Sequence, residues 1–465
     1  MFPRHAQTRR QLVLLLYWML CVVPTLGVGA WCVWSRLPWL SRAEAAWIGH
    51  LVGMDATLDD VRRPRPDTTL YCGLSLADRE SGRPAFSCRR VEIRRGNGNE
   101  IGNGNGDRRP DGISPGDAPR DASGVASGGN AEKSAPQRPT VCVAFGETRC
   151  YAEQSHQWLR LLESLLAHRM GPAEADLHCT FDRLEVLRDE RSYTLSDVTV
   201  TLSRASDATS LDVAFRTTEA ADGPPGRIRV TRRREATSPA AKFELTCTEQ
   251  SAVPCALLAC FAPIFERTGV QSDFSGRLLG RETPDGWRYD IVDGLFRNVP
   301  LDRLVGDRFP PHRLEGVGRL ELDRASASAG RLIVAEGLFA ADGGRMSREL
   351  AEACATRLGM ESPPQVAPGG LPFQRFEAQF LLDDRGLQLA ASPKFGKTIA
   401  FARDGRPLWD EPPPGTIVPM AALLDALTPL RGAASKENTA RTALRRRLPL
   451  EAEPALAERP SGKRR

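Results

Sequence analysis

Two short motifs have the residue types and spacing of known chemical sites. Residues 391–398 read ASPKFGKT and fit a relaxed phosphate-binding loop, in which backbone N–H groups curl around phosphates and a helix begins at Lys-Thr. Pro393 removes one such N–H group, and residues 399–402 alternate like a strand. Residues 112–116 have the Gly-x-Ser-x-Gly spacing of a nucleophile elbow, but they lie in a polar segment that offers no strand and helix to hold the serine. We therefore expect neither nucleotide binding nor acyl transfer.

The other polar residues that could do chemistry do not form a recognisable constellation. The Asp383-Asp384 pair stands just before Gly386, which favours a tight turn over acid–base work. The run of three arginines at 232–234 is typical of a solvated strand end. Four of the six histidines, His156, His168, His178 and His312, are scattered along the chain. The sequence predicts a non-enzymatic protein with no catalytic residue, no cofactor or cofactor-binding residue and no metal ligand.

The charge of the chain is concentrated in its C-terminal tail. The formal net charge is +5, yet residues 431–465 alone hold ten Lys/Arg against four Asp/Glu, a net of +6. The remaining residues therefore sum to about −1, so nucleic acid is not an expected partner. With 41% hydrophobic residues in 465, the chain can form two or three globular units.

The strongest pattern in the sequence is an uncharged apolar run at residues 12–34. About 20 apolar residues suffice to cross a bilayer as a helix. Arg4, Arg9 and Arg10 precede the run and no acidic residue lies within the first 34 positions, so the positive-inside rule keeps the N-terminus in the cytoplasm. We expect a single-pass protein of the inner (cytoplasmic) membrane with its bulk on the exoplasmic or periplasmic side.

A cleaved signal peptide is the alternative interpretation of this run. Residues 28–30 (Val-Gly-Ala) form a small-residue end that could serve as a cleavage site. Against cleavage, the apolar run continues beyond that point, and four tryptophans follow that suit an interfacial belt: Trp31, Trp34, Trp39 and Trp47. A retained anchor is therefore favoured.

Eleven cysteines occur without a CxxC motif or zinc spacing. Cys142 and Cys150 flank a segment centred on Gly146 that reads as a hairpin turn, which predicts a cross-strand disulfide. Cys72 and Cys88 are a second, weaker pair. Small buried thiols are the alternative.

Hydrophobic periodicity predicts many short strands and few helices. Two segments fall outside this pattern: an insertion at 96–140, which has almost no large apolar residue, and the tail at 431–465, which is polar and basic. Helices are expected at 41–54, 154–169, 255–267, 345–358 and 419–427. Strands are expected at 70–76, 86–93, 141–143, 177–181, 184–187, 193–202, 211–215, 228–231, 243–247, 274–280, 287–292, 314–322, 332–339, 376–382, 387–391 and 398–403.

Evenly spaced short strands favour a mainly β fold with a few short helices, antiparallel throughout, as an elongated β-groove or a sandwich. Gly-Arg-Leu recurs at 276–278, 318–320 and 330–332, where the glycines indicate bulges or simple turns. The expected division is a cytoplasmic N-terminus (1–11), the anchor (12–34), a juxtamembrane helix and first strands (35–95), a disordered insertion (96–140), a β-rich domain (141–270), a second β-rich segment (271–430) and a basic disordered tail (431–465).

The order and texture of these segments resemble the AsmA-like family of envelope proteins. The similar parts are the anchor followed by a helix, GLSLAD at 73–78, FSGRL at 274–278, WRYD at 287–290 and GLFRNVPLDRLV at 294–305. The resemblance covers residues 12–95 and 268–402. It implies a periplasmic, membrane-anchored β-groove with an apolar inner face, linked to lipid handling and envelope integrity. The family offers no catalytic residue to transfer to this chain.

Our leading hypothesis is an anchored, β-rich, non-enzymatic protein that handles lipid or organises the envelope. Its expected partners are membrane lipids and other envelope proteins. An anchored scaffold with a closed core and no lipid ligand is the first rival, since a second layer of protein can also cover an apolar sheet face. An enzyme whose residues come together only in the fold is the second.

Overall fold

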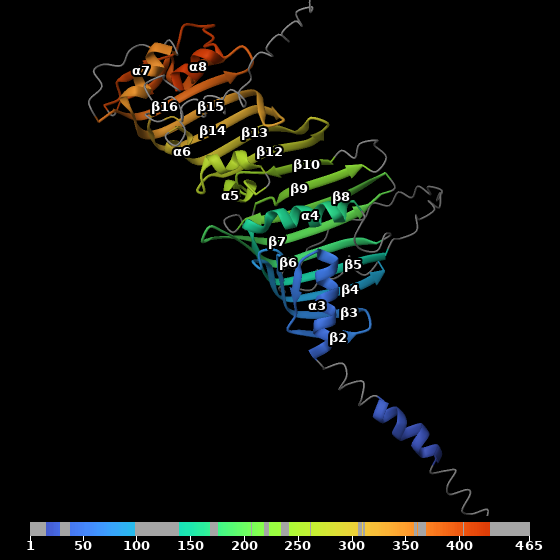
Figure 1. Ribbon diagram of the computed structural model, residues 1–465. Coiled ribbons are helices and arrows are strands. Elements are labelled where there is room, and N and C mark those ends of the chain that lie inside the picture. Colours follow the sequence, from blue (N-terminus) through green and yellow to red (C-terminus); the bar gives the residue numbers. More distant parts are fainter. Residues whose placement is uncertain are drawn as a thin grey trace, which may run out of the picture.

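The computed structural model describes residues 15–27, 38–97, 139–167, 175–205, 207–217, 223–233, 241–260, 262–305, 309, 312–357, 360, 369–402 and 404–427. Within these residues, 19 strands form one open sheet, with short helices beside it (Figure 1). The prediction of a mainly β protein with a few short helices is therefore confirmed. The insertion at 96–140, apart from its edges, and the tail at 431–465 lie outside the described residues.

Most strands pair with the strand that follows them in the sequence, so the sheet is a long meander from the N-terminal to the C-terminal end (Figure 1). β10 pairs with β12, so the hydrogen-bonded sheet continues across position 270, which is the expected boundary between the two β-rich segments. The strand bounds are β1 (Asp55–Thr57), β2 (Asp60–Arg65), β3 (Thr68–Ala77), β4 (Pro84–Asn97), β5 (Pro139–Tyr151), β6 (Asp176–Arg188), β7 (Arg191–Arg204), β8 (Ala208–Thr217), β9 (Gly226–Arg233), β10 (Ala241–Cys247), β11 (Val253–Pro254), β12 (Asp273–Thr283), β13 (Gly286–Pro300), β14 (Leu314–Ser328), β15 (Arg331–Met346), β16 (Leu371–Leu382), β17 (Leu387–Ala391), β18 (Thr398–Phe401) and β19 (Pro407–Asp410).

One pairing departs from the expected antiparallel arrangement. β5 and β6 run parallel, with Val143 opposite Cys179, and the helix α4 (Ser155–Leu166) lies between them in the chain. A helix that packs on a sheet face returns the chain to the end where the previous strand began, and this geometry makes the next strand parallel. The expectation of a purely antiparallel sheet is therefore wrong at this pair. The apolar side of α4 is buried on the sheet, so the helix carries the chain back along the sheet before β6 begins.

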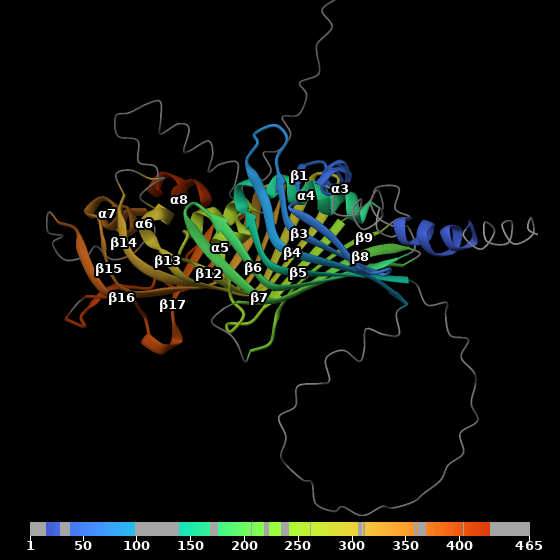
Figure 2. The same ribbon diagram turned by 90° about the horizontal axis from the view of Figure 1, so that it is seen from below.

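The helices beside the sheet lie on one of its sides (Figure 2). Pro38 starts α3, three residues before the predicted Ser41 cap, and Gly53 with φ 77 follows its end. The expected helix at 255–267 is broken into α5 and η3, since Pro263 cannot continue a helix from the preceding turn. The helix bounds are α3 (Pro38–Val52), η2 (Ala152–Gln154), α4, α5 (Cys255–Leu258), η3 (Pro263–Thr268), α6 (Leu301–Val305), α7 (Arg348–Arg357), η4 (Pro393–Phe395) and α8 (Met420–Leu427).

Residues 15–27 of the expected anchor are helical, with a π-helical segment η1 (Trp18–Val22). Residues 12–14 and 28–34 of that run lie outside the described residues. Among the helices that the structure describes, none is both long and apolar enough to cross a membrane.

The predicted Cys142–Cys150 disulfide is wrong. Both residues lie in the single strand β5, and eight residues of extended chain hold them roughly 26 Å apart. Cys72 and Cys88 are also free thiols: Cys72 stands opposite the exposed Arg90, whereas the neighbouring Cys88 is buried on the other side of the sheet. The hairpin interpretation failed because Gly146, which was expected to form a turn, lies within the continuous strand β5.

Gly276 shows what the Gly-Arg-Leu repeat does in the fold. The register between β12 and β13 shifts at this residue, where φ is 123°, and an added Cβ would lie 2.4 Å from the Asp293 carbonyl oxygen. A bulge with so close a backbone approach requires glycine. Gly318 likewise follows a register shift, whereas Gly330 with φ 75 belongs to the turn between β14 and β15.

The centre of the largest core is an aromatic cluster beneath η3. Phe274 is completely buried, and its ring centroid lies 5.0 Å from that of Phe296 and 5.9 Å from that of Phe265.

We predict that Phe274→Ala lowers the free energy of unfolding by about 3–5 kcal/mol, because it leaves a cavity between two rings. Ile333→Ala, at a side chain that is 43% exposed, should change it by less than about 0.5 kcal/mol. Denaturant midpoints of the full chain measure both, and equal shifts would contradict this account of the core.

Candidate functional site: the apolar inner face of the sheet

We call the side of the sheet that faces α3–α8 the inner face. The strand register places an apolar residue opposite an apolar residue on this face from β4 to β16 without interruption. At about 4.8 Å per strand, this row extends over roughly 50 Å. This apolar row consists of Ile93, Val143, Cys179, Val200, Val213, Ile228, Leu245, Leu278, Ile291, Ala325, Ala335 and Leu382.

A second row runs beside the first, two residues away on each strand from β5 to β14 and three residues away on β15. It crosses the sheet from β5 to β15 and contains the ring of Phe243 next to Gly280 and the ring of Tyr289. An added Cβ on Gly280 would lie 1.9 Å from the Phe243 ring, so the aromatic side chain lies directly over the glycine. The second row consists of Val141, Leu177, Leu202, Leu211, Val230, Phe243, Gly280, Tyr289, Ala327 and Leu332.

The opposite, outer face carries charged residues that pair across neighbouring strands. The Arg229 Nε atom lies 2.6 Å from Asp212 Oδ1, and the Arg277 Nε atom lies 2.7 Å from Glu244 Oε1. Arg324 and Glu336 repeat the arrangement at 2.8 Å. These side chains are solvent-exposed, so each pair contributes little to stability. Their effect is to keep the outer face wet while the inner face is apolar.

Short helices cover parts of the inner face completely. Leu162, Leu165 and Leu166 of α4 pack over Leu202, which is 1% exposed, and over Leu211. Phe265 of η3 stacks against Phe296 at 5.9 Å. Each contact removes apolar area from water at about 25 cal/mol per Å², and this burial holds the helices on the sheet.

Other members of the two rows are only half-buried. Phe243 and Tyr289 pack ring to ring at 6.0 Å and keep partial exposure, and burial raises the pKa of the Tyr289 hydroxyl. The remaining half-buried members are Ile93, Val141, Leu177, Val200, Val213, Val230, Ile228, Ile291, Ala327, Leu332 and Leu382. Partly covered apolar side chains that follow one line over most of the sheet can bind an extended apolar ligand.

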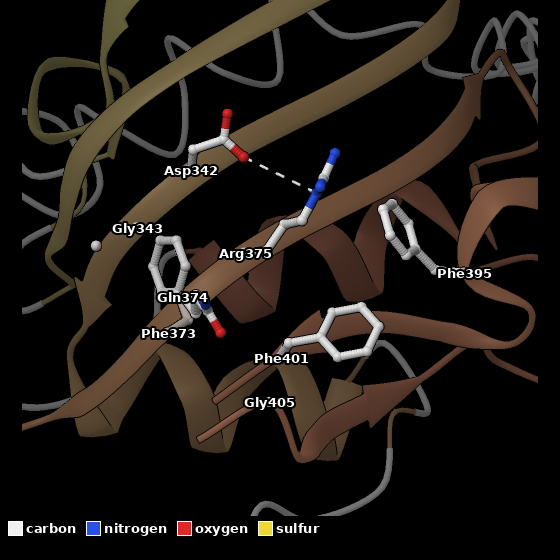
Figure 3. Close-up of a pocket in the computed structure, with 9 residues that line it drawn as sticks. Asp342, Gly343, Phe373, Gln374, Arg375, Phe395, Phe401 and Gly405 are labelled. Carbon is white, nitrogen blue, oxygen red and sulfur yellow. Dashed lines mark ion pairs between the residues drawn. The ribbon is translucent and has the colours of Figure 1, made fainter. Parts of the chain in front are cut away.

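A separate pocket of about 640 Å³ lies at the C-terminal end of the sheet, where β15, β16 and β18 meet (Figure 3). The Arg375 guanidinium lies 4.4 Å from the centroid of the Phe395 ring, and its Nε atom is 3.8 Å from Asp342 Oδ1. The Arg375 Nη2 atom also donates to Glu377 Oε2 at 3.0 Å, and the Glu377 side chain is only 1% exposed.

The charge of this pocket is already compensated. Two carboxylates and one aromatic ring surround the single guanidinium and balance its charge, while its buried Nε atom has no hydrogen-bond partner among the described residues. Arg375 was not singled out from the sequence, because Asp342 lies 33 positions away and only the β15–β16 pairing brings the two residues together. We assign the cluster a structural role in joining the last strands.

The motifs considered from the sequence do not converge on one site. Residues 391–398 span the end of β17, η4 and the start of β18, so no helix follows the Lys-Thr pair. Asp383 accepts hydrogen bonds from the backbone N–H and side chain of Arg385, which lower the pKa of its carboxyl, and it forms the β16–β17 turn. Residues 112–116 and His168 lie outside the described residues.

The described histidines are far apart in the fold. His178 Nδ1 lies 3.2 Å from Thr201 Oγ1, and His156 is exposed on α4. His312 is buried, and its Nε2 atom donates to the Ala426 carbonyl at 2.8 Å, which ties α8 to the sheet. Burial lowers the pKa of His312. The structure contains no group of three or more His, Cys, Asp or Glu side chains that could hold a metal ion within the ranges it describes.

No protein-family model, curated protein or solved structure matches this chain.

We predict that Arg375→Ala lowers the free energy of unfolding by roughly 2–3 kcal/mol, because it leaves the buried Glu377 carboxylate unpaired. The double variant Arg375→Ala with Glu377→Gln should recover part of the loss, since no unpaired charge is then buried. Arg385→Ala, which removes an exposed ion pair with Asp383 at 2.7 Å, is the matched control and should change little. Denaturant midpoints distinguish these variants, and an Arg375→Ala midpoint equal to that of the control would refute the structural role.

The buried thiols should be unreactive in the folded protein. Burial raises the pKa to about 12 for Cys150, Cys179, Cys247, Cys255 and Cys354. At pH 8 only roughly one such thiol in 10,000 is a thiolate. We expect iodoacetamide to modify the half-buried Cys72 well before Cys255, and both alike in urea, as followed by peptide mass spectrometry. Equal native rates would show that the inner face opens readily.

Proposed function

We propose that this protein is a single-pass, membrane-anchored and non-enzymatic protein whose periplasmic or exoplasmic sheet binds lipid acyl chains along its inner face. The apolar row from Ile93 to Leu382 is the observation that carries the proposal. An acyl chain needs a continuous apolar surface with no charge along it, and this row offers one across twelve consecutive strand positions. The physiological role would be lipid handling or organisation of the envelope.

The incomplete cover of the inner face supports a ligand over a closed core. Leu245 and Leu278 are almost fully buried, whereas Ile228 and Ile291 on either side of them in the same row are only partly buried. Contact between apolar side chains and water is unfavourable, so a ligand that covers a line of partly buried apolar side chains gains binding free energy. A lipid chain would cover them and pass the fully buried positions along the neighbouring row.

The N-terminal run supports a location at the membrane. In residues 15–27 the apolar side chains are directed to solvent, with Leu20 70% and Met19 71% exposed. The basic residues before the run place the N-terminus in the cytoplasm, so the sheet would lie on the other side of the inner membrane. The proposal thus agrees with the AsmA-like character suggested by the order of the segments.

An anchored scaffold without lipid is the second candidate. Its supporting observation is the burial beneath η3 and α4, where Phe274 and Leu202 lose nearly all contact with solvent. In this candidate, the helices and the side chains packed against them form a closed protein core on the inner face. Envelope proteins would then be the partners.

Photo-crosslinking distinguishes the two candidates. A benzophenone-bearing phenylalanine analogue is placed at Tyr289, on the inner face, and in a matched variant at Val292, which is 37% exposed on the outer face three residues later in β13. The full chain is irradiated in cell membranes and the adducts are identified by mass spectrometry.

We expect phospholipid adducts at Tyr289 and none at Val292, because acyl chains would contact only the apolar side of β13. An Ile291→Glu substitution beside the probe should abolish the lipid adduct, whereas Val292→Glu should leave it. Adducts to protein alone at Tyr289 would overturn lipid binding in favour of the scaffold.

A further inference from the structure

The helix α3 presents an apolar face to solvent. Trp39, Trp47 and Leu51 are 43%, 58% and 40% exposed, and the spacing of four and eight residues puts them on one side of the helix together with Ala43. A helix at the surface of a globular protein normally turns such residues inward and polar residues outward. Two exposed tryptophans on one helix face therefore indicate a surface that something else covers.

The rest of α3 is fixed to the first strands, so this face cannot rotate inward. Ala45 is buried and Ile48 and Val52 pack into the core that contains Met54 and Val61. An added Cβ on Gly49 would meet the Met54 carbonyl oxygen at 2.7 Å, which shows how closely the backbone of α3 lies against β1.

Polar contacts hold the same orientation. Glu44 accepts a hydrogen bond from Arg63 at 2.5 Å and lies 3.4 Å from the Tyr71 hydroxyl, and Arg79 donates to the Gly49 carbonyl at 3.0 Å. Glu44 is the only acidic residue of α3, and it is directed to the strands. The exposed positions of the helix contain Arg42 and His50 and no carboxylate.

The position of α3 in the chain identifies the surface that covers it. Only three residues separate the end of the apolar run at Trp34 from the start of α3 at Pro38, a reach of roughly 14 Å at full extension. A membrane that holds the run therefore lies beside α3. Tryptophans on an apolar helix face with a basic and no acidic neighbour are suited to the headgroup region, above all to anionic lipids.

We propose that the exposed face of α3, formed by Trp39, Ala43, Trp47, His50 and Leu51 with Arg42 at its edge, docks into the headgroup layer of a phospholipid bilayer. This inference rests on the membrane anchor of the proposed function and adds the surface that orients the sheet. Because α3 packs on β1, β2 and β3, docking sets the N-terminal end of the apolar row against the membrane, where a lipid could leave the bilayer.

The test places the benzophenone analogue at Trp47 of the full chain in nanodiscs that contain phosphatidylcholine and phosphatidylglycerol. The matched control is Leu159, which is 40% exposed on α4, a helix that packs on β8 and meets the first strands through Trp158 and Gln157. We expect at least about tenfold more lipid adduct at Trp47 than at Leu159, since only an interfacial position contacts headgroups and glycerol continuously.

Lipid adducts at neither position, or adducts from Trp47 to a second copy of the chain, would overturn the docking proposal. The Tyr289 probe in the same nanodiscs reports separately on the inner face. An adduct at Trp47 without one at Tyr289 supports docking and contradicts lipid binding by the sheet, whereas the reverse contradicts docking alone. A chain that does not enter nanodiscs lacks the anchor, and both proposals then fail.

Discussion

The register between neighbouring strands is the constraint on which the rest of this structure depends. A shift of one residue at any pair would exchange the two faces of the following strands, because side chains alternate with a period of two. Here the register places Ile228 opposite Leu245 and Leu278 opposite Ile291, and it shifts at Gly276, where two residues of β13 face one of β12. An unbroken apolar row with charged pairs on the other face is the consequence.

The helices follow from that constraint because an apolar sheet face must be covered. α4 covers Leu202 and η3 covers Phe274, and the return of the chain through α4 makes β5 and β6 the one parallel pair among the pairings described. These helices are short, so they leave Tyr289 and its neighbours half-covered. The partial cover is what makes lipid binding a physical possibility and a closed scaffold its competitor.

Most of the fold could be predicted from local pattern. The alternation in β7 and β14 and the face of Trp158, Leu162 and Leu165 in α4 are properties of short segments, and the predicted strands and helices there agree with the structure. The predictions failed where a residue type has two local meanings. Gly146 and the cysteines beside it read as a hairpin, yet they continue a strand, and Pro263 divides a segment that reads as one helix.

The sequence by itself determined that the chain forms many alternating strands and that an apolar run precedes them, because these features follow from neighbouring residues. Only the tertiary structure decided which strand pairs with which, that the β5–β6 pair is parallel, and that Asp342 meets Arg375. It also decided which side of α3 stays exposed. Strand pairing and burial depend on contacts between residues that lie tens or hundreds of positions apart. A local pattern does not specify which distant residues come into contact.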